Sequence, residues 1–125
     1  MMKILYYSGQ HEQKSAQILN MIESAAPGSE ISIHTTLDGF SGALRQYHES
    51  QTIAVILTAL TEELLNILLL RELLRSIPSL LILPDDSKET VSKGSLLQPR
   101  YICCLEDDLS SLHDVLQKMV EKYNA

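Results

Sequence analysis

The carboxylates of this sequence gather in three clusters, each of which follows a short apolar segment: Glu62-Glu63, Asp85-Asp86 and Glu106-Asp107-Asp108. Convergent carboxylate oxygens are what a hard divalent cation requires, so these clusters could form a metal site. Each cluster also stands where a helix is predicted to begin, and there carboxylates cap free N–H groups and face the positive end of the helix dipole. We favour capping and expect no metal.

Thiols and imidazoles are the other reactive groups. Cys103 and Cys104 are adjacent, and a disulfide between neighbours would close a strained ring. We therefore expect reduced thiols in a buried strand, as in a cytosolic protein, with raised pKa values and little reactivity. The histidines show no metal-ligand spacing, and we expect them on the surface: His11, His34, His48 and His113.

Hydroxyl and glycine residues follow two further apolar segments, as Ser8-Gly9 and as Thr58. Tyr7-Ser8-Gly9-Gln10 opens a predicted helix and resembles the phosphate loop of flavodoxins, where backbone N–H groups cradle an anion. The loop has no second glycine, and the chain has no Trp to stack on a flavin. We favour a structural turn. The alternative is a small flavodoxin-like ligand-binding protein or enzyme that uses Ser8, Gly9 and Thr58.

Composition limits the class of protein. With 125 residues, 45% of them hydrophobic and 21% charged, the sequence predicts one globular domain over residues 1–125. A net charge of −6 and scattered basic residues argue against nucleic-acid or membrane partners. We find no leader-like segment and no apolar stretch long enough to span a bilayer, and we expect a soluble cytoplasmic protein.

Five predicted strands alternate with segments of helical period. Four are short apolar runs, at residues 4–7, 53–57, 80–83 and 101–105, and the fifth, at 30–35, alternates Ile31 and Ile33 with polar residues, which is typical of a less buried strand at an edge. Apolar strands separated by helices predict a parallel sheet covered on both faces. Right-handed crossovers favour a three-layer, doubly wound (βα)5 sandwich of the α/β class, with a five-stranded parallel sheet of order 2-1-3-4-5. Ligands of such sheets bind where the strands end, at the carboxyl edge.

The predicted helices begin at Glu12, Asp38, Thr61, Asp86 and Leu109. Asp38 and Asp86 are the predicted caps of their helices. Ala16, Leu19, Ile22 and Ala26 are predicted to form the apolar face of the first helix. Residues 61–77 are predicted to form one long helix, which ends at Pro78.

Two stretches resemble a bacterial response-regulator receiver domain: residues 72–83, and residues 101–112, where a strand leads into the last helix. The resemblance extends over nearly the whole chain. It implies a flavodoxin-like fold and a role in two-component signal transduction. The segment from Thr58 to Ile77 is four residues longer than in receivers, and we interpret the loop after the third strand as converted to helix, which extends the 61–77 helix by one turn over the former active site.

The residues that carry receiver chemistry are absent. Ser8-Gly9 replaces the acidic pair that holds Mg²⁺, Thr58 the phosphorylated Asp, Pro84 a Ser or Thr, and Cys104 the Lys. Tyr101 retains the aromatic residue of strand 5. A neutral threonine hydroxyl needs an activating base, which is absent here. The resemblance therefore implies a degenerate pseudo-receiver that is not phosphorylated, is not an enzyme and needs no metal or cofactor.

The leucines of the 61–77 helix suggest what such a domain does instead. Ile67, Leu70 and Leu74, with Leu69 beside them, suffice to cover the sheet, whereas Leu64, Leu65 and Leu68 fall near the charged side. These three could bind a protein partner or a second copy, with Tyr101 marking the alternative face. Packing of the three within the core is the competing interpretation. We predict a protein-interaction module.

Overall fold

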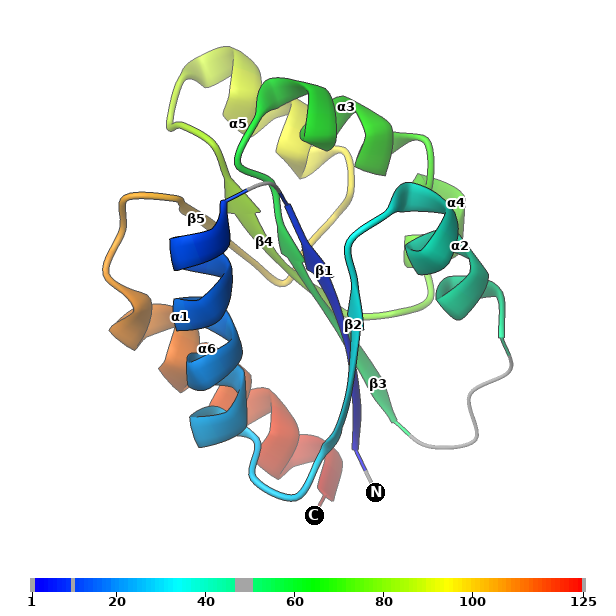
Figure 1. Cartoon of the computed structure of the whole chain (residues 1–125), viewed down its shortest axis with the longest axis vertical. Helices are drawn as coiled ribbons and strands as arrows, with labels where there is room; N and C mark the ends of the chain where they lie inside the picture. Colours follow the sequence, from blue (N-terminus) through cyan, green and yellow to red (C-terminus); the bar gives the residue numbers. More distant parts are fainter. Residues whose placement is uncertain (1, 10, 47–50, 125) are drawn as a thin grey trace.

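The computed structural model describes residues 2–9, 11–46 and 51–124, which contain five strands and six helices. One helix follows each strand except the third, which two helices follow (Figure 1). The strands are β1 (Lys3–Ser8), β2 (Glu30–His34), β3 (Thr52–Leu57), β4 (Ser79–Leu83) and β5 (Tyr101–Cys104). The helices are α1 (Glu12–Ala25), α2 (Leu37–Arg45), α3 (Thr61–Leu68), α4 (Arg71–Leu74), α5 (Lys88–Ser95) and α6 (Leu109–Asn124).

The strands form one parallel sheet of order β2-β1-β3-β4-β5, which confirms the predicted topology. β1 pairs with β2 on one side and β3 on the other, and this register places Tyr6 of β1 between Ile33 of β2 and Val55 of β3. Every residue of β3 and β4 is buried, because helices cover both faces of these central strands. β2 lies at an edge and is only partly buried, as its alternating sequence predicts.

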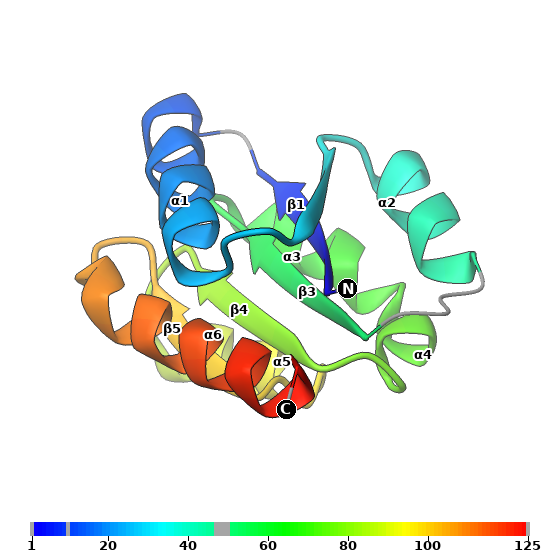
Figure 2. The ribbon, with the colours of Figure 1, turned by 90° about the horizontal axis from the view of Figure 1, so that it is seen from below.

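Alternate strand residues build two apolar cores on opposite sides of the sheet. Val55 and Leu57 face the core beneath α1 and α6, whereas Ile56 faces the core beneath α2, α3, α4 and α5. Figure 2 shows α1 and α6 side by side in one layer. The three-layer architecture follows from strand alternation together with the two groups of helices.

The segment 61–77 is not one helix, and this prediction is wrong. α3 ends at Leu68 and the short α4 begins at Arg71. At the break, the N–H of Leu69 donates to the carbonyl of Asn66 at 3.1 Å, and that of Leu70 to the carbonyl of Ile67 at 2.8 Å. These bonds span three residues rather than four, so the chain tightens and changes direction.

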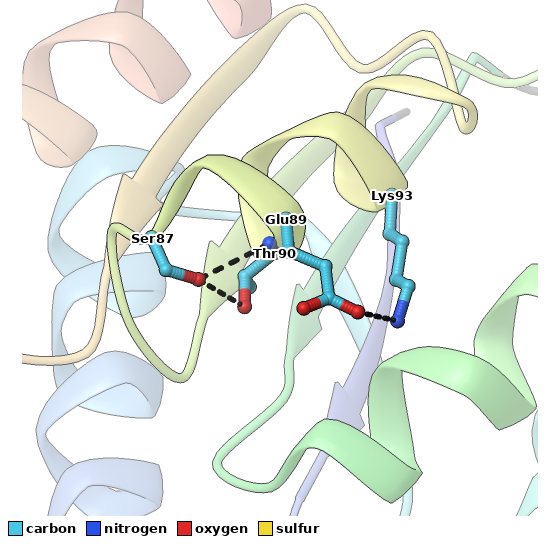
Figure 3. Close-up of polar contacts among 4 residues, drawn as sticks. All are labelled: Ser87, Glu89, Thr90 and Lys93. Carbon is cyan, nitrogen blue, oxygen red and sulfur yellow. Dashed lines mark hydrogen bonds and ion pairs between the residues drawn. The ribbon is translucent and has the colours of Figure 1, made fainter.

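Two predicted caps are also corrected. The α2 cap is Thr36, whose hydroxyl accepts from Gly39 N at 3.1 Å, and Asp38 lies within the first turn. The α5 cap is Ser87 rather than Asp86, and Figure 3 shows its hydroxyl beside Thr90. A hydroxyl directly before the first helical residue reaches the free N–H groups, whereas a carboxylate one position away does not.

The buried face of α1 also differs from the predicted one. Ala16 is exposed and Leu19 is half-buried, whereas the buried residues of the helix are Ile18, Met21, Ile22 and Ala25. Ala26 is buried just beyond the helix end. Ile22 and Ala26 are therefore buried as predicted, whereas the start of the predicted face is wrong because it followed Ala16 rather than Ile18.

Candidate functional site

Four strand ends bring the positions that the receiver resemblance aligned with a phosphoacceptor site to the carboxyl edge of the sheet. Ser8 ends β1 and Gly9 follows it, Thr58 follows β3, Pro84 follows β4, and Cys104 ends β5. They do not form one cavity. Pro84 and Cys104 line one hollow, Ser8 and Gly9 line another, and Thr58 is fully buried between them.

The hydroxyl of Thr58 is already bonded within the sheet. It donates to the carbonyl of Ile82 at 2.7 Å, and the backbone N–H of Thr58 donates to the same carbonyl at 3.0 Å. The side chain is 0% exposed. The Thr58 hydroxyl, at the position that the resemblance aligned with the phosphorylated Asp of receivers, is therefore a buried structural group that a phosphoryl donor cannot reach.

Glu63 is the side chain that fills the space next to the end of β3. Its carboxylate is buried and accepts from the backbone N–H of Ala59 at 2.7 Å and of Leu60 at 3.0 Å. Two charge-assisted bonds to the free end of α3 stabilise the carboxylate where it lies. The capping expected of Glu62-Glu63 is therefore carried by Glu63, the third residue of the helix.

The Glu63 carboxylate also packs against the loop after β1. A Cβ atom on Gly9 would lie 2.7 and 2.9 Å from its two oxygens and 2.6 Å from the carbonyl oxygen of Leu57. Only a residue without Cβ fits such a close approach. A phosphate seated on Ser8-Gly9 would face this negative charge, which disfavours the phosphate-loop alternative.

Hydroxyl groups occupy the opposite side of the β1 end. The Ser8 and Ser15 hydroxyls are hydrogen-bonded to each other, and the Tyr6 hydroxyl donates to the carbonyl of Ser15 at 3.0 Å. Burial raises the pKa of Tyr6. A hollow of about 490 Å³ opens beside them, with Leu19 and Ile33 on its apolar wall. Ser8 is thus engaged in a structural contact.

The acidic clusters after β4 and β5 surround a hollow of about 160 Å³ lined by Pro84, Cys104, Asp85, Asp86, Glu106 and Asp107. The expected capping of a helix start is made here by Asp108, which accepts from Ser110 N at 2.7 Å in the first turn of α6, whereas Asp85 and Asp107 bond to turns outside the helices. Asp85 accepts from Ser87 N at 2.9 Å, and Asp107 accepts from Cys104 N at 2.8 Å. The bond from Ser87 N lowers the pKa of Asp85. Within the described residues, no three His, Cys, Asp or Glu side chains are placed to hold a metal ion.

Both cysteines are free thiols, with Cys103 buried and Cys104 half-buried. Burial, together with Asp107, raises the pKa of Cys103 to about 12, and burial also raises that of Cys104. Neither thiol is activated as a nucleophile at neutral pH.

The histidines depart in part from the expected surface positions. His11 is exposed and caps α1 by accepting from Lys14 N at 3.1 Å. His34 and His113 are half-buried, and the ring of His34 lies 6.1 Å from that of Phe40, between ring centres. His48 lies outside the described residues.

The leucines of α3 are arranged differently from the prediction. Leu64 is fully buried, so it belongs to the core and cannot be part of a surface, and Leu68 is half-buried. Leu65 is 43% exposed, and Leu69, expected to cover the sheet, is 75% exposed. Glu63 and Leu64 are both buried, whereas Leu65 on α3 and Leu69 at its C-cap are exposed and four residues apart, and we call these two leucines the "leucine ridge".

Tyr101, the alternative marker of an interaction face, is half-buried and packs against the core beneath α1 and α6. It offers less apolar surface to a partner than the leucine ridge does. No helix in the described part of the chain combines the length and the apolar character that a bilayer crossing requires.

Neither a family model nor a curated protein sequence matches this chain. Two solved structures do share its fold. One is a protein assigned to pilus assembly (CpaE) from Burkholderia thailandensis E264, with 18% identity and a TM-score of 0.70, covering 97% of this chain and 99% of that chain. The other is a pilus assembly-related protein from Burkholderia pseudomallei K96243, with 20% identity and a TM-score of 0.70, covering 98% and 91%. At these identities the similarity extends to the fold alone.

Proposed function

We propose that this chain is a degenerate receiver-like domain that works as a protein-interaction module rather than as an enzyme. The observation that carries the proposal is the filled space at the end of β3, in the middle of the carboxyl edge. Thr58 is bonded to Ile82, and the Glu63 carboxylate fills the space against Gly9. The central part of the edge where this fold class binds ligands is thus occupied by the chain's own side chains, with a hollow remaining on either side of it.

The leucine ridge supports the proposed role in protein interaction. Among the described residues Leu69, which directly follows α3, is the most exposed large apolar side chain, and Leu65 of α3 precedes it by four residues. Burying each leucine against a partner recovers roughly 1.5–3 kcal/mol before association costs are subtracted. A bacterial signalling or assembly complex is the setting we propose, supported by the receiver resemblance and by two structural neighbours assigned to pilus assembly.

An attempt to phosphorylate the chain tests the claim that it is a degenerate receiver-like domain. Incubation with acetyl phosphate and Mg²⁺ should leave the intact mass unchanged, because no acidic pair, Asp or Lys stands at the required positions. Mg²⁺ should also leave Tm unmoved, since a ligand specific to the native state must raise it. A stoichiometric gain of one phosphoryl group would refute the pseudo-receiver assignment.

Substitution of the leucine ridge tests the proposed role in protein interaction. Leu65→Lys plus Leu69→Lys should abolish self-association, or capture of a partner identified with the wild type, as measured by sedimentation velocity. Tm should remain within a few degrees of the wild-type value, because exposed positions contribute little to stability. Gln17→Lys plus Asn20→Lys, on the exposed side of α1, is the control for added charge. Unchanged association in the ridge variant would exclude the ridge as the interface.

A further inference from the structure

A second surface lies at the other end of the molecule, along α6. Five residues line a hollow of about 290 Å³ there: Arg100, Val115, Lys118, Met119 and Lys122. Arg100 precedes β5, and the other four come from α6, between its middle and its C-terminal turn. We call this surface the basic groove. It lies at the amino end of β5, away from the acidic hollow at the carboxyl end.

Helical spacing explains why these side chains share one flank of α6. Val115 and Met119 are four residues apart, as are Lys118 and Lys122, so each pair is stacked along the helix. The opposite flank faces α1, where His113 Nε2 lies 3.4 Å from the Ser24 hydroxyl (Figure 2 shows the two helices together). The groove is therefore on the flank of α6 that α1 does not cover.

The charge of the groove is distinctive in an acidic protein. The whole chain carries −6, yet three of its ten basic residues converge here, and among the described residues no acidic side chain lines the hollow. In the described part of the chain, Arg100, Lys118 and Lys122 take part in no ion pair, whereas Arg75 and Lys93 are paired with glutamates. Unpaired cations beside a half-buried apolar floor favour an anionic ligand that also has apolar groups.

We propose that the basic groove binds an acidic, amphipathic peptide segment of a partner protein, in which carboxylates contact Arg100, Lys118 and Lys122 while apolar side chains cover Val115 and Met119. The flexible thioether of Met119 suits such a variable contact. The acidic whole-molecule charge repels nucleic acid and anionic membranes, so a peptide, which presents only local charge, is the favoured occupant. This surface is separate from the leucine ridge and extends the proposed function to a second contact.

Selection from a random-peptide phage library tests the proposal directly. Peptides selected on the immobilised wild-type chain should be enriched in Asp and Glu interspersed with Leu, Ile or Phe. Lys118→Glu plus Lys122→Glu should weaken binding of the best selected peptide by at least about tenfold, as measured by fluorescence anisotropy. Added salt should weaken wild-type binding, because exposed charges are screened.

A charge-matched control locates the effect. Arg45→Glu plus Lys88→Glu changes the net charge by the same amount at exposed positions outside the groove, and it should bind the peptide like the wild type. Circular dichroism confirms the fold of each variant. The leucine-ridge variant should also bind normally, which separates failure of this proposal from failure of the ridge.

Three results would overturn the proposal. The first is a selection without acidic enrichment, and the second is equal loss of binding in the groove and control variants. The third is groove-dependent binding to phosphatidylserine vesicles or single-stranded DNA with no acidic peptide selected, which would assign the surface to a different ligand.

Discussion

At the scale of single residues, Gly9 lets the Glu63 carboxylate approach the loop after β1, because it has no Cβ atom. We predict that Gly9→Ala lowers the free energy of unfolding by about 1–3 kcal/mol, because the new methyl group would clash with the Leu57 carbonyl and the Glu63 carboxylate. Denaturant unfolding measures the loss. Gly42→Ala is the matched control, because a Cβ atom there meets nothing within 4 Å. Since Gly42 lies within α2, this substitution should raise the free energy of unfolding by about 0.5–1 kcal/mol. Wild-type stability of Gly9→Ala would show that the contact with Glu63 does not hold the edge closed.

The two adjacent thiols should differ in reactivity. In the folded protein at mildly alkaline pH, we predict that iodoacetamide alkylates Cys104 much faster than Cys103, because Cys103 is buried with a pKa of about 12. Peptide mapping by mass spectrometry separates the two sites, and both should react in denaturant. Faster alkylation of Cys103 in the folded chain would mean that β5 opens or frays in solution.

The sequence predicts the role of a single residue well where that role depends on its neighbours along the chain. Capping by a glutamate near a helix start, and reduced thiols in an aliphatic strand, depend on neighbours along the chain. The approach of Gly9 to Glu63 depends on how the β1 loop meets α3, which no sequence spacing encodes. The positions of Thr58 and Cys104 at the strand ends were predictable, because the strand boundaries were.

At the scale of elements, α3 and α4 were the segment that period alone could not resolve. Strands such as β3 and β4 are short apolar runs between polar turns, and one interpretation fits them. In the segment 64–70 nearly every position is apolar, with Asn66 the exception, so several helix rotations give an apolar inner face. The inward turn of Glu63 selects among them. That choice places Leu64 in the core and Leu69 in solvent.

Neighbouring leucines of α3 should therefore respond oppositely to truncation. Leu64→Ala should cost about 2–5 kcal/mol of unfolding free energy, because it leaves a cavity in the core beneath α2 to α5. Leu65→Ala should change stability by less than about 0.5 kcal/mol, because its side chain is already 43% exposed. Urea titration of the two variants compares them directly. A similar large loss for both would place Leu65 in the core and remove it from the leucine ridge.

The whole molecule separates its polar and apolar roles by position. Acidic side chains cap the turns at the carboxyl edge after β4 and β5. At the amino end of β5, Arg100, Lys118 and Lys122 line the basic groove, and among the described residues they form no ion pair. The leucine ridge lies on the other side of the sheet from the groove, because α3 and α6 cover opposite faces. A partner bound at one surface leaves the other accessible, which suits a module that joins two components.

Alkaline pH should expose a further property of the whole fold. Burial raises the pKa of Tyr6, Tyr7 and Cys103, the last from its ordinary value of 9.0 to about 12. Above about pH 9 the unfolded chain releases these protons while the folded chain retains them, so the unfolded state binds fewer protons and stability must fall as pH rises.

The expected slope is about 1.4 kcal/mol per pH unit for each group, between its unfolded and folded pKa values. Urea unfolding at a series of pH values from neutral to strongly alkaline measures it. Cys103→Ala should reduce the part of the slope that begins near pH 9 and leave the tyrosine part, which begins near pH 10, in place. A flat profile up to pH 11 would show that water reaches these side chains in the folded protein, and that the two cores flanking β1 are less closed than the structure describes.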